Sequence, residues 1–479
     1  MEILTHGIKL LFVLFLLYTL IYLLHWGLGL CISVHRLSAF SDHKRLIRRI
    51  LPNQIARDFP VSVIIPAHNE ETCICDTVGS LLLDDYPGLQ IIVVDDGSTD
   101  QTAQRVREHF GLDRISLPLP DTIPTKMVTG CFQTQVHDKK ILLICKENGG
   151  KSDALNCGLN FCGTPYCVVL DADTQVSRGS IRMMASRFLL DSRTIVCAGS
   201  IGSNFRQQDL YPHLSILQKF LVRFQQMEYY RTFYMQRLLF EQINANVIVS
   251  GAFAMFDTRL LRSVGGYRND TIGEDMEIAM RLHAFCKSQD RPYRIAYMPE
   301  AQCYTQFPFR YRDFVRQRRR WHIGMLQCFG QHLYMLGNRS YGWAGLISGT
   351  FLMVYEFLAP FVELLGFVTL IAAYYLNILN LQFAWTALLA YALLSMLNQQ
   401  VLLHALRNYQ VEKVSVWDQL VLAFISLLEF LVFHPMNIAV KIIAVFMKGH
   451  HKSWEDIHRT GSDTSAAPQS AEEQKSAVS

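Results

Sequence analysis

The chain has 479 residues, of which 50% are hydrophobic and only 18% are charged. That apolar share is too high for a typical soluble enzyme and too low for a pure transporter. The formal net charge of +4 is small, and the sequence contains no zinc finger or other nucleic-acid motif, which argues against nucleic acid as a partner. Because the apolar residues are concentrated at the two ends, we expect a soluble region between membrane segments.

The N-terminal segment, residues 1–35, is predicted to be a transmembrane helix. Residues 10–34 contain no Asp, Glu, Lys or Arg, and about 20 apolar residues are enough to cross a bilayer core. A cleaved signal peptide is the alternative, but its apolar part would be only about 7–15 residues long. The run here is longer and is followed by Arg36, which favours an uncleaved anchor.

The basic linker that follows, residues 36–60, sets the expected orientation. Only Lys9 lies just before the apolar run, whereas six basic residues come after it: Arg36, Lys44, Arg45, Arg48, Arg49 and Arg57. Basic flanks stay on the cytoplasmic side of a membrane. We therefore expect the catalytic region to face the cytosol, in a multi-pass protein of the plasma (inner) membrane.

The next region, residues 61–310, is predicted to be a catalytic domain of α/β class. Short runs rich in β-branched residues are typical of buried strands, and four occur here, at 61–65, 90–94, 141–145 and 166–170. Helical patterns lie between them, which indicates a mostly parallel, Rossmann-like sheet. Residues 111–140 read as an irregular insertion. Ligands of such sheets bind beyond the carboxyl ends of the strands, where polar clusters stand in this sequence.

Asp171 and Asp173 directly follow the fourth predicted strand. Such a pair is often only a solvated turn. At the end of a buried strand, however, two carboxylates can share a hard cation, and Mg²⁺ or Mn²⁺ would take its further ligands from phosphate oxygens. The pair is therefore a candidate site for a divalent metal, with Asp171 also able to serve a nucleotide.

Other polar groups follow the first three strands. Asp95 or Asp96 can hold a nucleoside by accepting hydrogen bonds, although a helix-capping turn is the simpler reading. Asn69 and Glu70 lie at the end of the first strand. Lys151 follows two glycines and can meet a phosphate, or can be an ordinary surface lysine.

A second acidic cluster, Glu274 and Asp275, is a candidate catalytic base. Asp275 would take the proton from an acceptor hydroxyl as its oxygen attacks the sugar donor, with Glu274 as the alternative and a helix cap as the plain reading. The small residues Ser250 and Gly251 come before this cluster and would allow a sugar to approach closely.

The segment 311–342 carries a basic and aromatic cluster next to the membrane. Gln317, Arg320 and Trp321 offer a bidentate contact for a diphosphate and a flat surface for a sugar ring. Gln317 and Trp321 are four residues apart and share a helix face. Contact with anionic headgroups is the alternative, and both can hold.

The C-terminal region, residues 343–448, contains three apolar blocks, at roughly 343–375, 383–403 and 417–447. The third is interrupted at Pro435, where helix bonding is broken. Glu356 lies inside the first block, where a charge is costly in lipid, so we expect it to face protein, a cavity or the interface. The tail, 449–479, is expected to be cytosolic, with a disordered end.

These motifs resemble the inverting, membrane-integrated glycosyltransferases of family 2, which include the poly-N-acetylglucosamine, chitin, cellulose and hyaluronan synthases. The matching segments are Val61–Glu71, Asp95–Asp100, Asn148–Asn156, Asp171–Asp173, Ser250–Phe253, Gly273–Leu282 and Gln317–Trp321. The resemblance implies a GT-A fold, a UDP-sugar donor, a divalent metal and formation of a β-linkage by inversion. It also places Pro66, Ala67, Asn69 and Glu70 near the nucleotide, which binds through Asp96 or Asp95.

Three functions follow as hypotheses. The first is a processive synthase that extends a β-linked polysaccharide, of N-acetylglucosamine or glucose, and passes it through its own helices, with or without export or accessory subunits. The second is an enzyme that transfers a single sugar to a lipid carrier, but such enzymes usually lack the Gln317–Trp321 cluster. The third is a catalytically silent sensor or export scaffold, which would be expected to have lost Asp171, Asp173 or Asp275.

Overall fold

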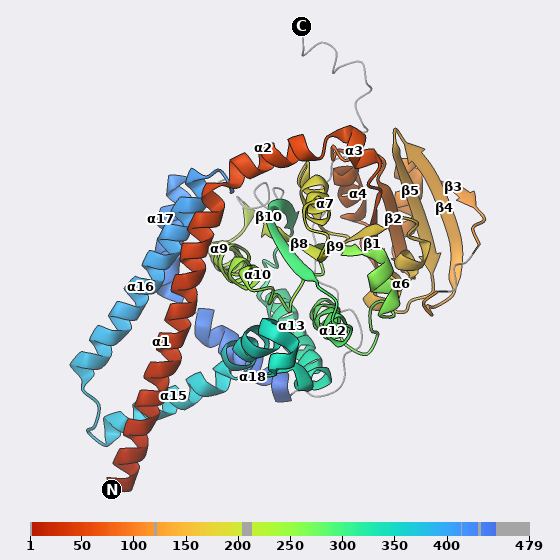
Figure 1. Ribbon diagram of the computed structural model, residues 1–479. Coiled ribbons are helices and arrows are strands. Elements are labelled where there is room, and N and C mark those ends of the chain that lie inside the picture. The colour runs from red at the N-terminus through yellow and green to blue at the C-terminus, as the bar shows by residue number, and fades with distance from the viewer. Residues whose placement is uncertain (1, 119–121, 204–212, 413, 430–432, 447–479) are drawn as a thin grey trace.

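The computed structural model describes residues 2–118, 122–203, 213–412, 414–429 and 433–446. Its core is a ten-stranded sheet in the order β3-β4-β5-β2-β1-β6-β9-β8-β10-β7, with helices packed on both faces and a group of long apolar helices to one side (Figure 1). This arrangement confirms the predicted α/β class with apolar helices at both ends of the chain.

The parallel part of the sheet matches the four predicted strands. They are Val61–Ala67 (β1), Gln90–Asp96 (β2), Lys139–Lys146 (β5) and Tyr166–Leu170 (β6). β1 pairs in parallel with β2 and β6, and β2 pairs in parallel with β5. The connecting helices are Ile74–Leu82 (α4), Thr102–Phe110 (α5) and Lys151–Phe161 (α6). β1 and β6 are almost entirely buried, which is why continuous apolar runs were the right signal for them.

The segment predicted as an irregular insertion, 111–140, instead contributes two strands to the sheet. Asp113–Ile115 (β3) and Val128–Val136 (β4) add two antiparallel strands beyond β5. The prediction was wrong because β4, with the sequence VTGCFQTQV, is a half-exposed strand rich in Gln and Thr. It lacks the continuous apolar run by which buried strands are found.

The other half of the sheet mixes strand directions. β9 (Phe253–Asp257) runs antiparallel to both β6 and β8 (Thr194–Ser203), and β8 runs parallel to β10 (Arg294–Thr305). The edge strand is Gln175–Val176 (β7). The helices of this half are Ser180–Leu190 (α7), Ile216–Arg231 (α9), Arg237–Gln242 (α10), Thr258–Ser263 (α11) and Glu274–Ser288 (α12), with a π-helical turn, Thr232–Gln236 (η2), joining α9 to α10.

The N-terminal helix α1 (Glu2–Ser38) continues three residues past the predicted segment. The linker behind it is also helical, as Phe40–Ile50 (α2) and Asn53–Arg57 (α3), and α2 lies along the top of the molecule in Figure 1. Glu300 of β10 binds both helices: its Oε1 is 3.1 Å from Arg36 and 2.7 Å from His43. These contacts, which are buried on the Glu300 side, tie the N-terminal apolar helix to the sheet.

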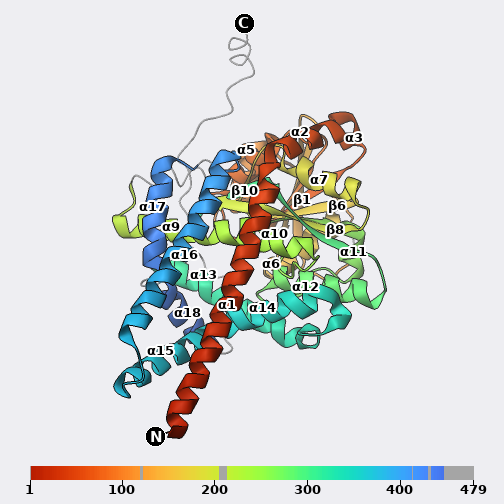
Figure 2. The same ribbon diagram turned by 60° about the vertical axis from the view of Figure 1, so that its left-hand side comes forward.

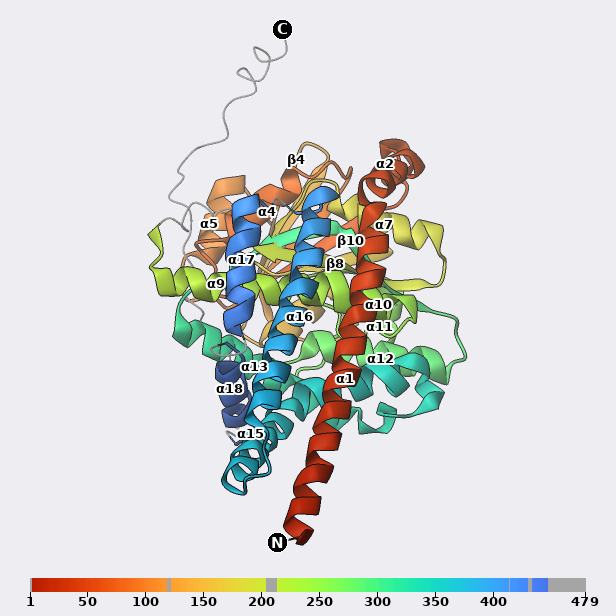
Figure 3. The same cartoon turned by 90° about the vertical axis from the view of Figure 1, so that its left-hand side faces the viewer.

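In the part of the chain that the structure describes, two helical segments are long and apolar enough to cross a membrane, His6–Ser38 and Leu381–Asn408. A third span results if the bent pair Ala344–Phe357 and Ala359–Tyr375 counts as one. The pair bends by 48°. Its pieces are η5 (Ala344–Gly349), α14 (Thr350–Leu352), η6 (Met353–Phe357) and α15 (Ala359–Tyr375). Figures 2 and 3 show α1 beside α16 (Leu381–Asn408), with which it is in contact.

The remaining segments surround this group. α13 (Tyr311–Gln331) and two 3₁₀ turns, Leu333–Met335 (η3) and Arg339–Tyr341 (η4), lead from the sheet into the bent pair. The third apolar block forms two shorter helices, Val416–Leu428 (α17) and His434–Phe446 (α18). Pro435 stands in the first turn of α18, where its missing N–H costs no helix bond. The predicted tail, 449–479, lies outside the described residues.

Candidate active site

A cavity of about 650 Å³ lies beyond the carboxyl ends of β1 and β6. It is lined by residues from all but one of the predicted clusters: Pro66, Asn69, Glu70, Lys151, Asp171, Asp173, Ser250, Gly251, Glu274, Asp275, Gln317, Arg320 and Trp321. Ala67, Asp95 and Asp96 are not among the lining residues. The topology explains why these residues lie together, because the loops that follow parallel strands all lie at the same edge of the sheet.

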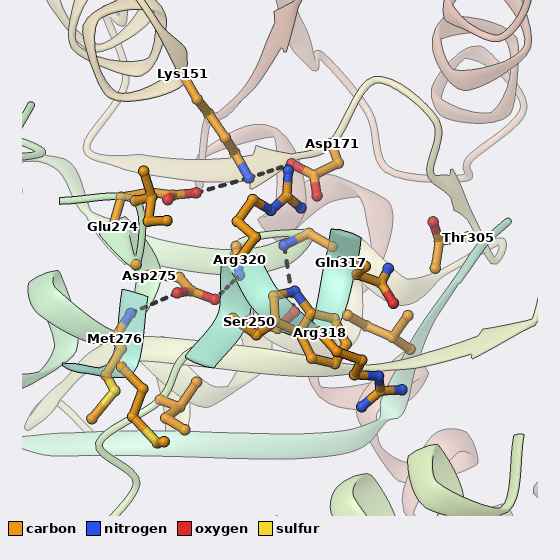
Figure 4. A pocket seen from close by; sticks show the side chains of 18 of the residues that line it. Lys151, Asp171, Ser250, Glu274, Asp275, Met276, Thr305, Gln317, Arg318 and Arg320 are labelled. Carbon is orange, nitrogen blue, oxygen red and sulfur yellow. Dashed lines mark hydrogen bonds and ion pairs between the residues drawn. The ribbon is translucent and has the colours of Figure 1, made fainter. Parts of the chain in front are cut away.

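Lys151 joins the two acidic clusters. It is the first residue of α6, and its Nζ lies 2.8 Å from Asp171 Oδ1 and 2.9 Å from Glu274 Oε1. Figure 4 shows the ammonium group between the two carboxylates. Burial alone would lower the pKa of Lys151, but the two carboxylates outweigh it and hold this pKa above its ordinary value. Lys151 is therefore a permanent positive charge at the centre of the site.

The neighbouring acids Glu274 and Asp275 differ in their electrostatics. Burial raises the pKa of Asp275, the charge of Glu274 raises it further, and Lys151 opposes both. Burial also acts to raise the pKa of Glu274, but the attraction of Lys151 is stronger, and the pKa of Glu274 is lowered. When the environments of two carboxyl groups push their pKa values apart in this way, the two groups can have different chemical roles. Asp275 has the stronger affinity for a proton, as a general base requires.

Asp275 is also fixed in place. α12 begins at Glu274, with no side-chain cap at Gly273. The Asp275 carboxylate accepts hydrogen bonds from the backbone N–H groups of Met276, at 2.8 Å, and Gly251, at 3.2 Å. The Gly251 contact ties α12 to the loop before β9. A Cβ atom on Gly251 would lie 3.3 Å from both Asp275 Cβ and Lys151 Nζ, so the absence of a side chain there makes room for this arrangement.

Asp171 and Asp173 lie in the turn after β6. The Asp173 carboxylate accepts a hydrogen bond from Thr305 Oγ1 at 3.1 Å. Burial raises the pKa of Asp173 to about 6, and the charge of Asp171 contributes. A cation would relieve this repulsion. Within the described part of the chain, no group of three or more His, Cys, Asp or Glu side chains could hold a metal. A metal at this pair would have to take most of its ligands from a bound diphosphate and water.

Asp96 has a different environment from the one its motif suggested. Its carboxylate contacts Lys146 Nζ at 2.6 Å and accepts from the backbone N–H of Gly150 at 2.7 Å. Lys146 also contacts Asp153 at 2.6 Å, and its side chain is fully buried. Asp96 thus holds the loop before α6 in position, and its contact with a nucleotide remains a prediction. Lys146 had no signal in the sequence beyond its place at the end of β5.

The cluster at 317–321 lies on α13. Trp321 is 42% exposed, and the guanidinium of Arg318 stacks on its ring at 4.5 Å. Arg318 is buried, contacts Glu228 at 2.5 Å and also lies over Phe314. Sequence reasoning missed Arg318, which fixes the indole by a cation–π contact. The charge of Arg320 reaches Glu274, whose pKa it helps to lower.

α12, which carries Glu274 and Asp275, and α13, which carries the cluster at 317–321, meet without side chains between them. A Cβ atom on Gly273 would lie 2.9 Å from the backbone of Gly324, and one on Gly324 would lie 2.9 Å from the backbone of Gly273. The start of α12 is therefore pressed directly against α13. Asp275 and Trp321 belong to two walls of one cavity whose spacing is set by this backbone contact.

The cavity continues toward the apolar helices. Leu352 and Glu356 of the bent pair and Asn437 and Lys441 of α18 line it, and Lys441 Nζ lies 2.9 Å from Glu356 Oε2. Glu356 was expected to face protein or a cavity, and it does both. Its partner was missed, although a single lysine within an apolar block is a comparable signal.

Two further lining residues had no sequence signal. Arg237 of α10 is buried and interacts electrostatically with Asp275; burial lowers the pKa of Arg237 to about 10, against the attraction of that acid. His322 is 3% exposed, and both of its ring nitrogens are buried without a hydrogen-bond partner among the described residues. Buried polar groups left unsatisfied beside a cavity point to a ligand or ordered water.

The mixed, mostly parallel sheet with carboxylates at its strand ends defines a GT-A-like fold. Comparison with known families agrees: residues 166–433 match the family described as glycosyl transferase family group 2, and residues 62–118 match glycosyl transferase family 2. Since the first match covers more than half of the chain, this protein belongs to glycosyl transferase family group 2.

Among curated proteins, the chain is 27% identical over 264 residues to a poly-beta-1,6-N-acetyl-D-glucosamine synthase of Staphylococcus epidermidis, covering 55% of this chain and 54% of the relative. A synthase of the same description from Staphylococcus aureus strain COL is 26% identical over the same length, again covering 55% and 54%. The chain thus aligns with about half the length of the curated relatives it matches.

Among solved structures, the chain is similar to the mannosyltransferase PcManGT from Pyrobaculum calidifontis in complex with GDP-Man and Mn²⁺. The TM-score is 0.48 and the identity 20%, over 85% of this chain and 99% of that one. It is also similar to TarS 1-349 of S. aureus in complex with UDP, with a TM-score of 0.37 and 14% identity, over 82% and 93% of the two chains.

Proposed function

We propose that this protein is a membrane-bound, inverting glycosyltransferase that transfers a sugar from a UDP-sugar to a growing β-linked polysaccharide. One observation carries the proposal: a single cavity contains the carboxylates Asp171 and Asp173, the candidate base Asp275 and the exposed ring of Trp321. Those are the groups that donor activation, proton removal and acceptor binding require.

In the transfer step, a carboxylate oxygen of Asp275 takes the proton of an acceptor hydroxyl. The acceptor oxygen then forms its bond to the anomeric carbon as the bond from that carbon to the diphosphate breaks, and the configuration inverts. Because burial and Glu274 raise the pKa of Asp275, this group holds the transferred proton better than an exposed carboxylate would.

The leaving diphosphate would be stabilised by positive charge in the cavity. A divalent metal, Mg²⁺ or Mn²⁺, held by Asp171 and Asp173 would neutralise its developing charge. Lys151 and Arg320 add fixed positive charge, and Gln317 has a buried Oε1 without a partner in the described structure, as a ligand-binding amide would. Pro66, Asn69 and Glu70, at the end of β1, line the cavity where the nucleotide would lie.

The acceptor side supports a processive synthase. Trp321 offers a ring on which a sugar can stack, and beyond it the cavity reaches Glu356 and Lys441 on apolar helices. A product held there lies partway between the active site and the membrane segments. The relatives named as poly-N-acetylglucosamine synthases favour the same conclusion. We further propose an inner-membrane, multi-pass protein with its catalytic region in the cytosol, which works with or without export or accessory subunits.

Membrane vesicles that contain the full chain test this function. The vesicles are supplied with Mg²⁺ or Mn²⁺ and with a panel of UDP-sugars that includes UDP-N-acetylglucosamine and UDP-glucose. We expect a polymer to form. Its size is measured by gel electrophoresis after the protein has been digested. Short products that extract into organic solvent would instead identify a lipid carrier as the acceptor. Release of no UDP from any donor would exclude the proposed transfer.

A further inference from the structure

A second cavity, of about 350 Å³, lies apart from the proposed active site and shares no lining residue with it. Its basic lining residues are Arg193, Lys287 and Arg291, and its aromatic ones are Tyr293, Tyr341 and Trp343. Nothing in the proposed transfer uses these side chains. We propose that this cavity binds the phosphate group of an anionic phospholipid at the membrane surface.

The charge of the cavity comes from Lys287 and Arg291. Arg193 is already neutralised, because its guanidinium forms two hydrogen bonds of 2.9 Å with Asp191. Within the described residues, neither Lys287 nor Arg291 has a carboxylate at ion-pair distance, and both side chains are exposed. Two unpaired cations beside a hollow attract an anion, and a guanidinium is well suited to phosphate oxygens.

The backbone near Lys287 shapes the cavity. Gly342 has a φ of +63°, a backbone conformation that residues other than glycine rarely adopt. A Cβ atom at this position would lie 3.4 Å from Lys287 Cε and 3.6 Å from Lys287 Nζ. The lysine therefore rests on the turn that leads into the apolar segment. Lys287 and the half-exposed indole of Trp343 line the same cavity.

The position of the cavity favours a lipid as the source of the phosphate. The segment directly after Trp343 packs against the middle of the N-terminal span: the rings of His25 and Phe351 stack at 3.9 Å, and Tyr355 donates a hydrogen bond to the carbonyl of Tyr18. Residues 351–355 thus lie at the depth of the apolar part of α1. Trp343 comes eight residues before this contact in the chain, and we infer that it lies at the entry to that layer.

The surface around this point has the composition of a membrane interface. Leu333, Tyr334, Trp343 and Ile347 are all exposed, by 59%, 50%, 51% and 38%. Tryptophan and tyrosine concentrate at the level of lipid headgroups, and basic pockets beside them bind anionic headgroups. Leu333 and Ile347 can contact the acyl chains of a lipid, and Lys287 and Arg291 can contact its phosphate group.

The purified full chain in phosphatidylcholine nanodiscs doped with phosphatidylglycerol tests this site. The variant Lys287→Gln/Arg291→Gln is compared with Arg105→Gln/Arg114→Gln, which removes the same charge from exposed positions on α5 and β3. Native mass spectrometry of the protein released from the discs counts retained phosphatidylglycerol. We expect the first variant to lose its bound lipid, with an affinity about tenfold or more weaker, and the second to match the unmodified chain.

Further measurements identify the source of the phosphate. Glycerol phosphate, which carries the headgroup without acyl chains, should fail to displace the lipid, and Trp343→Ala should weaken retention while thermal unfolding stays unchanged. Equal retention by both double variants would overturn the site. An equal loss from both would also overturn it, because the effect would then be one of overall charge. Displacement by glycerol phosphate at matched concentration would reassign the cavity to soluble phosphates and contradict the lipid.

Discussion

The Nζ atom of Lys151 lies 2.9 Å from Oε1 of Glu274, so a residue at the start of α6 is joined directly to the start of α12. This link sets the charge beside Asp275, because Lys151 acts to lower the pKa of that acid. The site therefore depends on a cation placed more than a hundred residues before the proposed base, and its removal has a defined consequence.

Lys151→Met should move the pH dependence of transfer. Asp275 must be deprotonated to act as a base, so kcat/KM falls as the pH drops through the raised pKa of Asp275. Without Lys151 that pKa rises further, and the acid limb of the profile shifts to higher pH. The profile of kcat/KM measured in vesicles checks this shift. Lys126→Met, at an exposed lysine outside the cavity, should leave the limb where it is.

Asp275→Asn should abolish turnover while leaving the donor bound. Loss of a general base typically costs about 10²–10⁴ in rate, whereas UDP-sugar affinity, measured by isothermal titration, should stay within a few-fold of the unmodified chain. Asp290→Asn, at an exposed position beyond the end of α12, serves as the control. If Asp275→Asn turned over normally and Glu274→Gln did not, the base would be Glu274.

Removal of divalent metal should stop the reaction reversibly. Chelation of vesicles by EDTA is expected to abolish UDP release, and Mg²⁺ or Mn²⁺ should restore it. Asp173→Asn keeps the shape of the side chain but removes a ligand charge, so this variant should need much more metal for half-maximal rate. Full activity in EDTA would contradict the assignment of Asp171 and Asp173.

Trp321→Ala should weaken acceptor use more than donor binding. A stacked aromatic contact contributes about 0.5–1.5 kcal/mol beyond its buried area, so we expect product length to shorten and Trp321→Phe to recover part of it. Arg318→Met should act in the same direction by freeing the indole. Trp417→Ala removes a 73% exposed indole from α17 and should change neither quantity.

Lys146→Met should destabilise the fold. Its buried ammonium contacts both Asp96 and Asp153 at 2.6 Å, and removal of one member of a buried ion cluster typically costs about 3–5 kcal/mol. Thermal unfolding of the purified protein, followed by tryptophan fluorescence, should show a clear drop in Tm. Adding Asp153→Asn should restore part of it, because one uncompensated carboxylate is then removed. An unchanged Tm would mean that the cluster contributes no net stability.

The sequence was a good guide where one physical cause dominated. β1, β2, β5 and β6 were predicted because strands buried on both faces must be continuously apolar. The polar residues that follow β1, β5 and β6 line one cavity because the topology leaves them no other edge. Strand β4 was missed since its exposed face carries Gln and Thr, which are equally at home in a loop.

The site was harder to predict wherever a side chain acts through a distant partner. Asp96 and Lys151 carry the same kind of signal, a polar residue after a strand, yet Asp96 turns to Lys146 and only Lys151 reaches the cavity. That choice is made by packing of the 146–150 loop. Arg318 and Arg237 interact with Glu228 and Asp275, which lie 90 and 38 residues away in the chain, and no local pattern reports these contacts. Lys441, 85 residues from Glu356, could have been found only as a single lysine within an apolar block.

The backbone contact between Gly273 and Gly324 has a mechanical consequence. Since α13 leads through η3 and η4 into the apolar segments, we expect any tilt of this helix to be transmitted to the first turn of α12, because no side chains lie between the two backbones at this contact. The distance between Asp275 and Trp321 would then change with the position of the apolar segments. An alanine at Gly273 or Gly324 would push α12 and α13 apart, because its Cβ atom would lie 2.9 Å from the facing backbone.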